Sequence, residues 1–266
     1  MRRPDPHPSL IDSHCHLTAG ELGQAPDEVW QRARDAGVDT LVLIGTDVSS
    51  CAEVVELVAS REGLFCAVGI HPNETARAES DALERITALL DAPKVVAVGE
   101  SGLDLHWHDA PQEVQERALE AHVELALARS LPLVLHVRDA YPRVAELLRR
   151  HVARGLRGVI HCFAGEEREV DPFLDWGFAI SFSGILTYAK AENVRGAARR
   201  TPLDLCLLET DAPWLTPAAE RGKVNEPAFL VHTAQRLAAE KGVTFEEIAA
   251  VTSANARRVF GLPDRQ

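Results

Sequence analysis

The chain has 266 residues, 46% of them hydrophobic and 26% charged, which is enough for one large domain with a sizeable core. Its net charge of −12 argues against a nucleic-acid binder that relies on a broad basic surface. No apolar run reaches the roughly 18 residues that a membrane span needs, so no membrane partner is expected.

The start of the chain carries two arginines, Arg2 and Arg3, but no apolar stretch follows them. A secretory signal needs such a stretch, so we expect no targeting segment and a cytoplasmic protein. The five cysteines form no CxxC pair and lie mostly in or beside apolar runs. We therefore expect buried thiols rather than disulfides or zinc-finger ligands. They are Cys15, Cys51, Cys66, Cys162 and Cys206.

Short apolar runs alternate with amphipathic stretches along the chain, and eight of the runs have the length of strands. Most are almost continuously hydrophobic, as expected of parallel strands that helices cover on the outside. The predicted strands are 10–17, 38–45, 64–70, 94–100, 131–138, 157–163, 178–184 and 203–211.

Amphipathic patterns predict helices between and after these strands. Residues 26–37 begin with Pro26 and end at a glycine, and residues 112–130 repeat apolar side chains at three- and four-residue steps. Residues 225–242, with Asn225 as the N-cap, and residues 245–261 predict two more helices after the last strand.

Eight such strand–helix units of about 30 residues have the usual size of a (β/α)8 TIM barrel. No linker or change of composition divides the chain, so we expect a single domain over residues 1–266. A doubly wound open sheet is the alternative with the same strands. The positions of the polar residues favour the barrel.

Polar side chains lie at the carboxyl ends of most predicted strands, where a barrel has its active site. A single histidine at such a position is more often structural than a ligand. In a barrel, however, the strand ends meet at one mouth, and so many imidazoles and carboxylates would be costly to bury without a cation. The predicted metal ligands are His14, His16, Glu100, His136, His161 and Asp211.

Six ligands exceed what one tetrahedral site needs, so we expect two divalent ions. Glu100 has two oxygens and can bridge them. Imidazole-rich sites suit zinc or manganese better than calcium, and magnesium is a further possibility. The remaining ligands divide into His14, His16 and Asp211 for one ion, and His136 and His161 for the other.

The predicted strand 10–17 reads LIDSHCHL. Because strand side chains alternate, Asp12 is expected on the same face as His14 and His16, with Ser13 and Cys15 on the other. A carboxylate beside a ligating histidine commonly accepts its second N–H. Asp12 is therefore predicted to support one of the two histidines.

Eight segments follow one another along the chain: DSHCHL, GIHP, GESGLD, LHVRDA, HCFAG, SFSG, ETDAPWL and RGKVNEP. In this order they resemble the TatD family of metal-dependent deoxyribonucleases, within the amidohydrolase superfamily, and the resemblance covers the chain from Leu10 to about Gly261. The resemblance implies a TIM barrel, the same six metal ligands and hydrolysis of DNA phosphodiester bonds. It also implies a 3′–5′ exonuclease acting on single strands or 3′ ends, with no obligate protein partner.

In the expected reaction, a water that bridges two metals attacks phosphorus, and Asp211 takes the proton. Glu100 joins Asp211 as the second catalytic carboxylate. His71, Arg138 and Arg221 are expected to hold phosphate oxygens. The metals and these arginines would compensate locally for the acidic chain.

Several aromatic side chains have simpler interpretations. Trp107 either stacks on a base or caps the barrel rim. Three histidines in helical stretches are expected on the surface: His122, His151 and His232.

Two alternative functions remain. The same metal centre would serve an ester or amide hydrolase, for example one acting on D-aminoacyl-tRNA. A metal-binding scaffold without turnover is the other possibility, and fewer than one metal per chain would favour it.

Overall fold

The computed structural model describes residues 9–18 and 23–264. The expectation of no targeting segment, which concerns Arg2 and Arg3, lies outside these residues. Among the described residues, no helix is long and apolar enough to cross a membrane.

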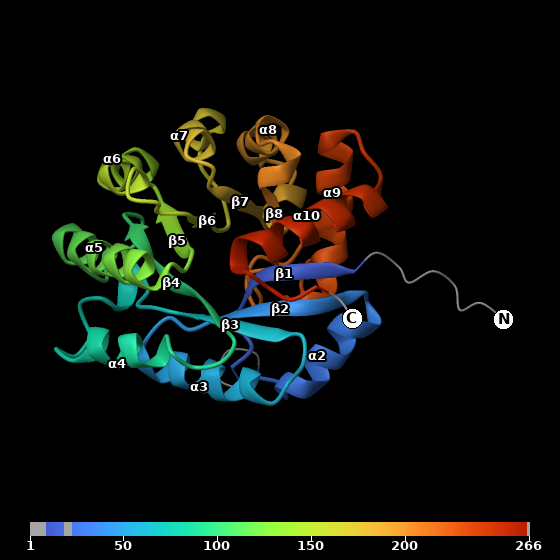
Figure 1. The fold of residues 1–266 in the computed structure, drawn as a ribbon. Helices are drawn as coiled ribbons and strands as arrows, with labels where there is room; N and C mark the ends of the chain where they lie inside the picture. The colour runs from blue at the N-terminus through green and yellow to red at the C-terminus, as the bar shows by residue number, and fades with distance from the viewer. Residues whose placement is uncertain (1–8, 19–22, 265–266) are drawn as a thin grey trace.

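Eight strands form one parallel sheet in chain order, and helices surround it (Figure 1). The first and last strands also meet: the backbone N–H of Asp211 donates to the carbonyl of His14 (2.9 Å), and that of His16 donates to Ala212 (2.8 Å). These bonds close the sheet, which confirms the (β/α)8 barrel over the open sheet. The strands are β1 Leu10–Cys15, β2 Val38–Ile44, β3 Leu64–Val68, β4 Val95–Asp104, β5 Leu133–Arg138, β6 Gly158–Ile160, β7 Ala179–Phe182 and β8 Cys206–Leu208.

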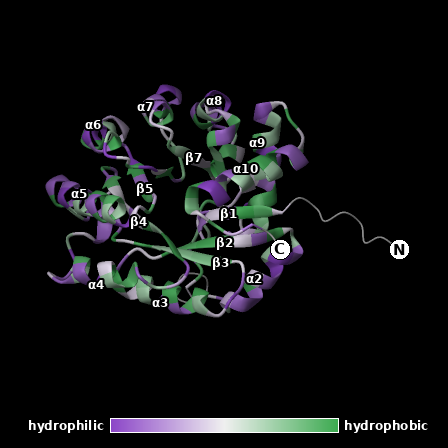
Figure 2. Ribbon diagram, in the orientation of Figure 1, coloured by the Kyte–Doolittle hydropathy of each residue, from purple (hydrophilic) through white to green (hydrophobic). Residues whose placement is uncertain are grey.

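The helices present apolar faces to the barrel and hydrophilic faces outward, while the strands are mostly hydrophobic (Figure 2). This matches the continuous apolar runs of the sequence, because both faces of a parallel strand are covered. The helices are α2 Pro26–Asp35, α3 Val48–Ala59, α4 Ala82–Leu89, α5 Gln112–Arg129, α6 Tyr141–Val152, α7 Asp171–Asp175, α8 Glu192–Arg200, α9 Leu230–Lys241 and α10 Phe245–Phe260.

Helix α10 closes the amino-terminal end of the barrel. Its residues Ala256, Val259 and Phe260 pack against the barrel interior. Asn255 Nδ2 donates to the carbonyl of Cys206 at the start of β8 (2.9 Å). The side chains that fill the interior are small or branched: Ile11, Val42, Ala67, Val134, Val159, Ala179 and Leu207. The opposite, carboxyl end of the barrel is the end that carries the predicted polar residues.

Strand β4 is longer than predicted, and β6 and β8 are shorter. Strand β4 continues to Asp104 because Gly99 and Gly102 allow the close approach of β5; a Cβ at Gly102 would collide with the carbonyl of His136. Strands β6 and β8 end before His161 and Asp211, which lie in the segments that follow.

The helix predicted for residues 225–242 begins later, at Leu230, after a 3-10 turn at Pro227–Phe229. Asn225 is not its N-cap. Its buried side chain donates through Nδ2 to the carbonyls of Thr210 (2.9 Å) and Trp214 (2.5 Å). Asn225 therefore braces the loop after β8.

Strand β1 does not keep the strict alternation predicted from its sequence. A register shift against β2, typical of a β-bulge, lies between Asp12 and Cys15. Ser13 Oγ consequently lies 3.1 Å from Ser181 Oγ of β7. The Asp12 carboxylate accepts from the backbone N–H (3.0 Å) and hydroxyl (2.5 Å) of Thr210. Asp12 therefore holds the seam between β1 and β8, and it supports His14 through the backbone, because its Oδ1 accepts the N–H of His14 (3.2 Å).

The surface positions predicted for His122 and His151 are wrong, since both side chains are buried. His122 Nδ1 donates to the carbonyl of Ala118 (2.7 Å), and its Nε2 accepts from the N–H of Ile70 (3.0 Å). This bond fixes the backbone just before His71. His232 is partly exposed.

Candidate metal centre

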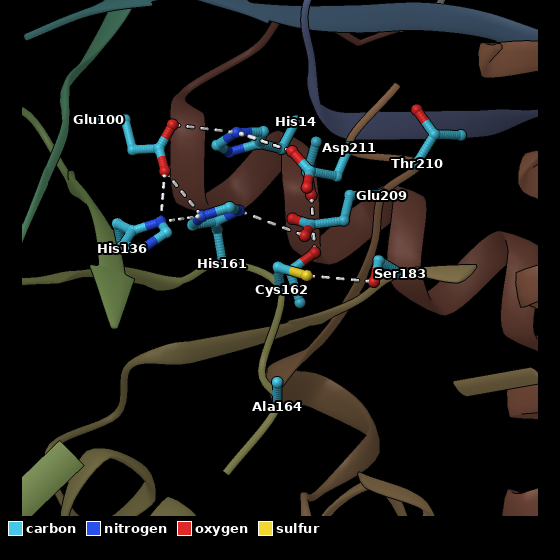
Figure 3. Close-up of polar contacts among 12 residues, drawn as sticks. His14, Glu100, His136, His161, Cys162, Ala164, Ser183, Glu209, Thr210 and Asp211 are labelled. Carbon is cyan, nitrogen blue, oxygen red and sulfur yellow. Dashed lines mark hydrogen bonds and ion pairs between the residues drawn. The ribbon is translucent and has the colours of Figure 1, made fainter. Parts of the chain in front are cut away.

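The six predicted ligands come together at the carboxyl end of the barrel. Figure 3 shows five of them: His14, Glu100, His136, His161 and Asp211. Nε2 of His14 and Nε2 of His16 lie 3.2 Å apart, and both lie within 3.6 Å of Oδ1 of Asp211. These side chains line or border a cavity of about 740 Å³, which is also lined by His71, Arg138 and two tryptophans. Its volume is that of a small-molecule binding site.

Glu100 lies between the two predicted ligand sets, with one oxygen directed to each. Its Oε2 is 3.4 Å from Nε2 of His14. Its Oε1 is 2.9 Å from Nδ1 of His136 and 2.8 Å from Nε2 of His161. A carboxylate in this position has the geometry of a bridge between two cation sites.

The side-chain atoms that face Oε1 of Glu100 are suited to bind a cation. His136 donates through Nε2 to Oδ2 of Asp104 (3.1 Å), so its Nδ1 presents a lone pair to Glu100. Nε2 of His161 lies 3.3 Å from that Nδ1 and faces the same carboxylate oxygen. Such converging lone pairs repel one another unless a proton or a metal ion lies between them.

The charges of the cluster agree with this arrangement. Burial alone would raise the pKa of Glu100, but His161, His71 and His14 lower it well below 4.5. Burial also opposes ionisation of Asp211, yet its hydrogen bond to His16 and the nearby imidazoles lower its pKa. Both carboxylates are therefore ionised at neutral pH and attract a cation.

The sequence reasoning missed two buried carboxylates that contact the outer nitrogens of the histidines. Asp104 accepts from His136, as described above. Oε1 of Glu209, which is fully buried, lies 3.4 Å from Nδ1 of His161. Burial lowers the pKa of His161, but Glu100 and Glu209 together raise it well above 6.5. Both acids lie within the motifs GESGLD and ETDAP, which was the available signal.

His71 lies closer to the cluster than expected of a residue that only binds substrate. Its Nε2 is 3.2 Å from Nδ1 of His136 and 3.6 Å from Oε1 of Glu100. Its Nδ1 accepts from the N–H of Asn73 (3.1 Å). The proton of the neutral ring is therefore on Nε2, which makes Nε2 a hydrogen-bond donor rather than a metal ligand.

The two arginines differ in position. Arg138 lines the cavity, and its guanidinium lies 5.6 Å from the centre of the Trp107 ring. Arg221 is exposed on the loop after β8 and is not among the described residues that line the cavity.

The thiols are distributed as the sequence suggests, with one exception. Four cysteines are buried, whereas Cys162 lines the cavity, 3.2 Å from Ser183 Oγ (Figure 3).

Proteins of similar sequence include metal-dependent hydrolases, which agrees with a metal-binding role for the clustered side chains. A family model described as TatD related DNase matches residues 11–261. The chain is 35% identical to the uncharacterized metal-dependent hydrolase YabD of Bacillus subtilis, over 94% of this chain and 98% of that protein. It is 34% identical to the 3′-5′ ssDNA/RNA exonuclease TatD of Erwinia amylovora, over 95% and 100% of the two chains. The crystal structure of YJJV, a TatD homolog from Escherichia coli, matches with a TM-score of 0.89 and 32% identity, covering 96% of this chain and 98% of that one.

Proposed function

We propose that this chain, which belongs to the TatD family of metal-dependent hydrolases, removes nucleotides from the 3′ end of DNA by hydrolysing phosphodiester bonds. The observation that carries the proposal is the position of Glu100. Its two oxygens face two histidine-containing ligand sets across one cavity. The Erwinia amylovora relative is named a 3′-5′ ssDNA/RNA exonuclease, which supports the proposed direction of cleavage and the single-stranded substrate.

We propose two ion sites. One ion would be held by His14, His16 and Asp211. The other would be held by His136 and His161, and Glu100 would bind both ions. Zinc, manganese or magnesium would serve. A pair of such ions, when bound, activates water and stabilises the charge that develops on a phosphoryl group.

Asp211 is the proposed proton acceptor. Its carboxylate is ionised at neutral pH for the reasons given above, and it borders the cavity. It can therefore take a proton from the attacking water and return it to the leaving oxygen. Its side chain is 14% exposed, so it is accessible from the cavity.

Phosphate oxygens would be held by His71 and Arg138. Burial and the nearby His136 lower the pKa of His71 to about 3, so the ring is neutral and donates through Nε2. Arg138 supplies a permanent positive charge at the rim. Arg221, outside the cavity lining, would contact a more distant phosphate. Together with bound metal, these groups offset the acidic net charge locally.

The test is digestion of end-labelled single-stranded DNA, duplex DNA and RNA across a metal series, beside a panel of esters and amides that includes a D-aminoacyl-tRNA. We expect single-nucleotide products released from the 3′ end, with activity lost on chelation. Cleavage of an ester or amide with intact oligonucleotides would overturn the proposal in favour of another hydrolase. Binding of metal with no turnover of any substrate would favour a scaffold. A cytoplasmic location stays a prediction of the sequence.

A further inference from the structure

Two tryptophans stand out at the mouth of the cavity. The large hydrophobic side chains exposed in the described part of the chain include Trp107, 52% exposed, and Trp214, 50% exposed, and both line the cavity. Single exposed apolar side chains are ordinary, but apolar exposure gathered around one cavity commonly marks a binding site. The common location of the two tryptophans at the proposed active site suggests that the bound partner is the substrate.

The backbone of each tryptophan is held by hydrogen bonds, while about half of the side chain stays exposed. The backbone N–H of Trp214 donates to the backbone carbonyl of Asp211 (3.0 Å), and the carbonyl of Trp214 accepts from Nδ2 of buried Asn225 (2.5 Å). The N–H of Trp107 donates to Oδ1 of Asp104 (3.0 Å). Positions anchored in this way are prepared for binding, because little conformational freedom is lost when a ligand arrives.

The two rings belong to opposite halves of the cluster. Trp214 stands edge-on to His16, with ring centres 4.9 Å apart. Trp107 is linked to the other half, since Asp104 binds both its N–H and Nε2 of His136. Trp214 therefore adjoins the half with His16, and Trp107 is connected through Asp104 to the half with His136.

We infer that Trp107 and Trp214 stack on the two bases that flank the scissile phosphodiester, and this inference rests on the proposed function. Aromatic stacking is tolerant of sequence and needs unpaired bases. It gives an acidic protein a source of affinity for single strands that does not depend on a basic surface. Arg138, whose guanidinium lies over the Trp107 ring, adds charge beside the same stack.

The experiment compares Trp214→Ala, Trp107→Ala and Trp214→Phe on single-stranded oligonucleotides. One set carries normal bases, and two sets carry an abasic site at the terminal or the penultimate nucleotide. Each tryptophan-to-alanine change should raise KM for normal DNA roughly 5- to 150-fold, with a smaller effect on kcat, as expected for stacking energies of about 1–3 kcal/mol per base. Phenylalanine should restore most of the loss.

The abasic substrates separate stacking from a structural role. Where the base that a tryptophan contacts is missing, its alanine variant should behave like the wild type. Val224→Ala is the matched control, because Val224 is an exposed hydrophobic residue on the loop after β8 that is not among the residues lining the cavity. Equal losses on normal and abasic DNA, or an unchanged KM, would overturn the inference.

Oligonucleotide binding by fluorescence anisotropy keeps this result separate from the proposed function. If the wild type cleaves DNA but the alanine variants bind it normally, only the stacking inference fails. If the wild type binds but does not cleave under any metal, the exonuclease proposal fails and the binding comparison still decides on stacking. Absence of binding by the wild type overturns both.

Discussion

Replacing Glu209 with Gln should weaken metal binding and leave the fold intact. The Glu209 side chain is fully buried, and within the described part of the chain neither of its oxygens makes a hydrogen bond of good geometry. Its nearest charged neighbour is Nδ1 of His161 at 3.4 Å. Glu209 therefore favours a proton on Nδ1, so Nε2 of His161, which faces Glu100, carries the lone pair when the ring is neutral and can bind a metal ion. Glutamine keeps the volume but removes the negative charge.

The expected magnitude follows from that contact. Loss of a carboxylate partner of a metal-binding histidine costs roughly 10- to 100-fold in metal affinity. This corresponds to about 1.4–2.8 kcal/mol. Removing the charge of Glu209 takes away its desolvation cost but also its attraction to the His161 ring, which keeps Glu100 as a partner. These two effects oppose each other, so the unfolding temperature of the metal-free variant should stay close to that of the wild type.

The assay is a calorimetric titration of chelator-treated protein with zinc or manganese, together with thermal unfolding of the metal-free form. Glu240→Gln is the matched control, because the largely buried Glu240 pairs with Arg199 (2.6 Å) and is not among the described residues that line the cavity. This control should leave metal affinity unchanged. Wild-type affinity in Glu209→Gln would refute the reasoning. So would a loss of affinity accompanied by an equal loss of metal-free stability, which would indicate damage to the fold.

Three further outcomes are expected. The double variant His14→Ala/His16→Ala should lose one metal ion and keep the other, and elemental analysis can count the ions. Unchanged metal content would contradict the assignment of these two histidines. Asp211→Asn should unfold at the wild-type temperature but lose hydrolysis, so near-wild-type turnover at saturating metal would exclude it as the proton acceptor. His122→Gln should flatten the pH dependence of stability. Burial lowers the pKa of His122, so the unfolded chain binds its proton more tightly. Through this group, the free energy of unfolding of the wild type should fall by up to about 1.4 kcal/mol per pH unit below pH 6.5. Urea titrations that give the wild type and His122→Gln the same pH slope would contradict this.

The barrel and its ligand set were predictable because they depend on order along the chain. Once alternating strands and helices imply a closed barrel, each residue that follows a strand lies at one mouth, whatever the details of packing. His136 and His161 could therefore be paired from the sequence although 25 positions separate them. The strict alternation predicted for β1 failed after Asp12, where a register shift against β2 interrupts it. Nothing in the residues 10–17 marks that shift.

The buried helix histidines show a second limit. His122 and His151 are polar residues in amphipathic stretches, and the sequence does not distinguish a solvent-facing histidine from one that a neighbouring element covers. Whether such a histidine is exposed or buried depends on how the neighbouring elements pack against its helix. The acceptor role of His122 toward Ile70 exists only because α5 lies against the end of β3.

By itself, the sequence determined the succession of elements, the barrel and the identity of the groups at its mouth, because chain order and hydrophobic pattern constrain all three. The tertiary structure alone decided how those groups act on one another. The opposed oxygens of Glu100, the proton positions set by Asp104 and Glu209, and the donor role of Nε2 in His71 depend on side-chain directions. Those directions follow from strand registers and from the course of the loops after β3, β4 and β8, and no local sequence pattern specifies them.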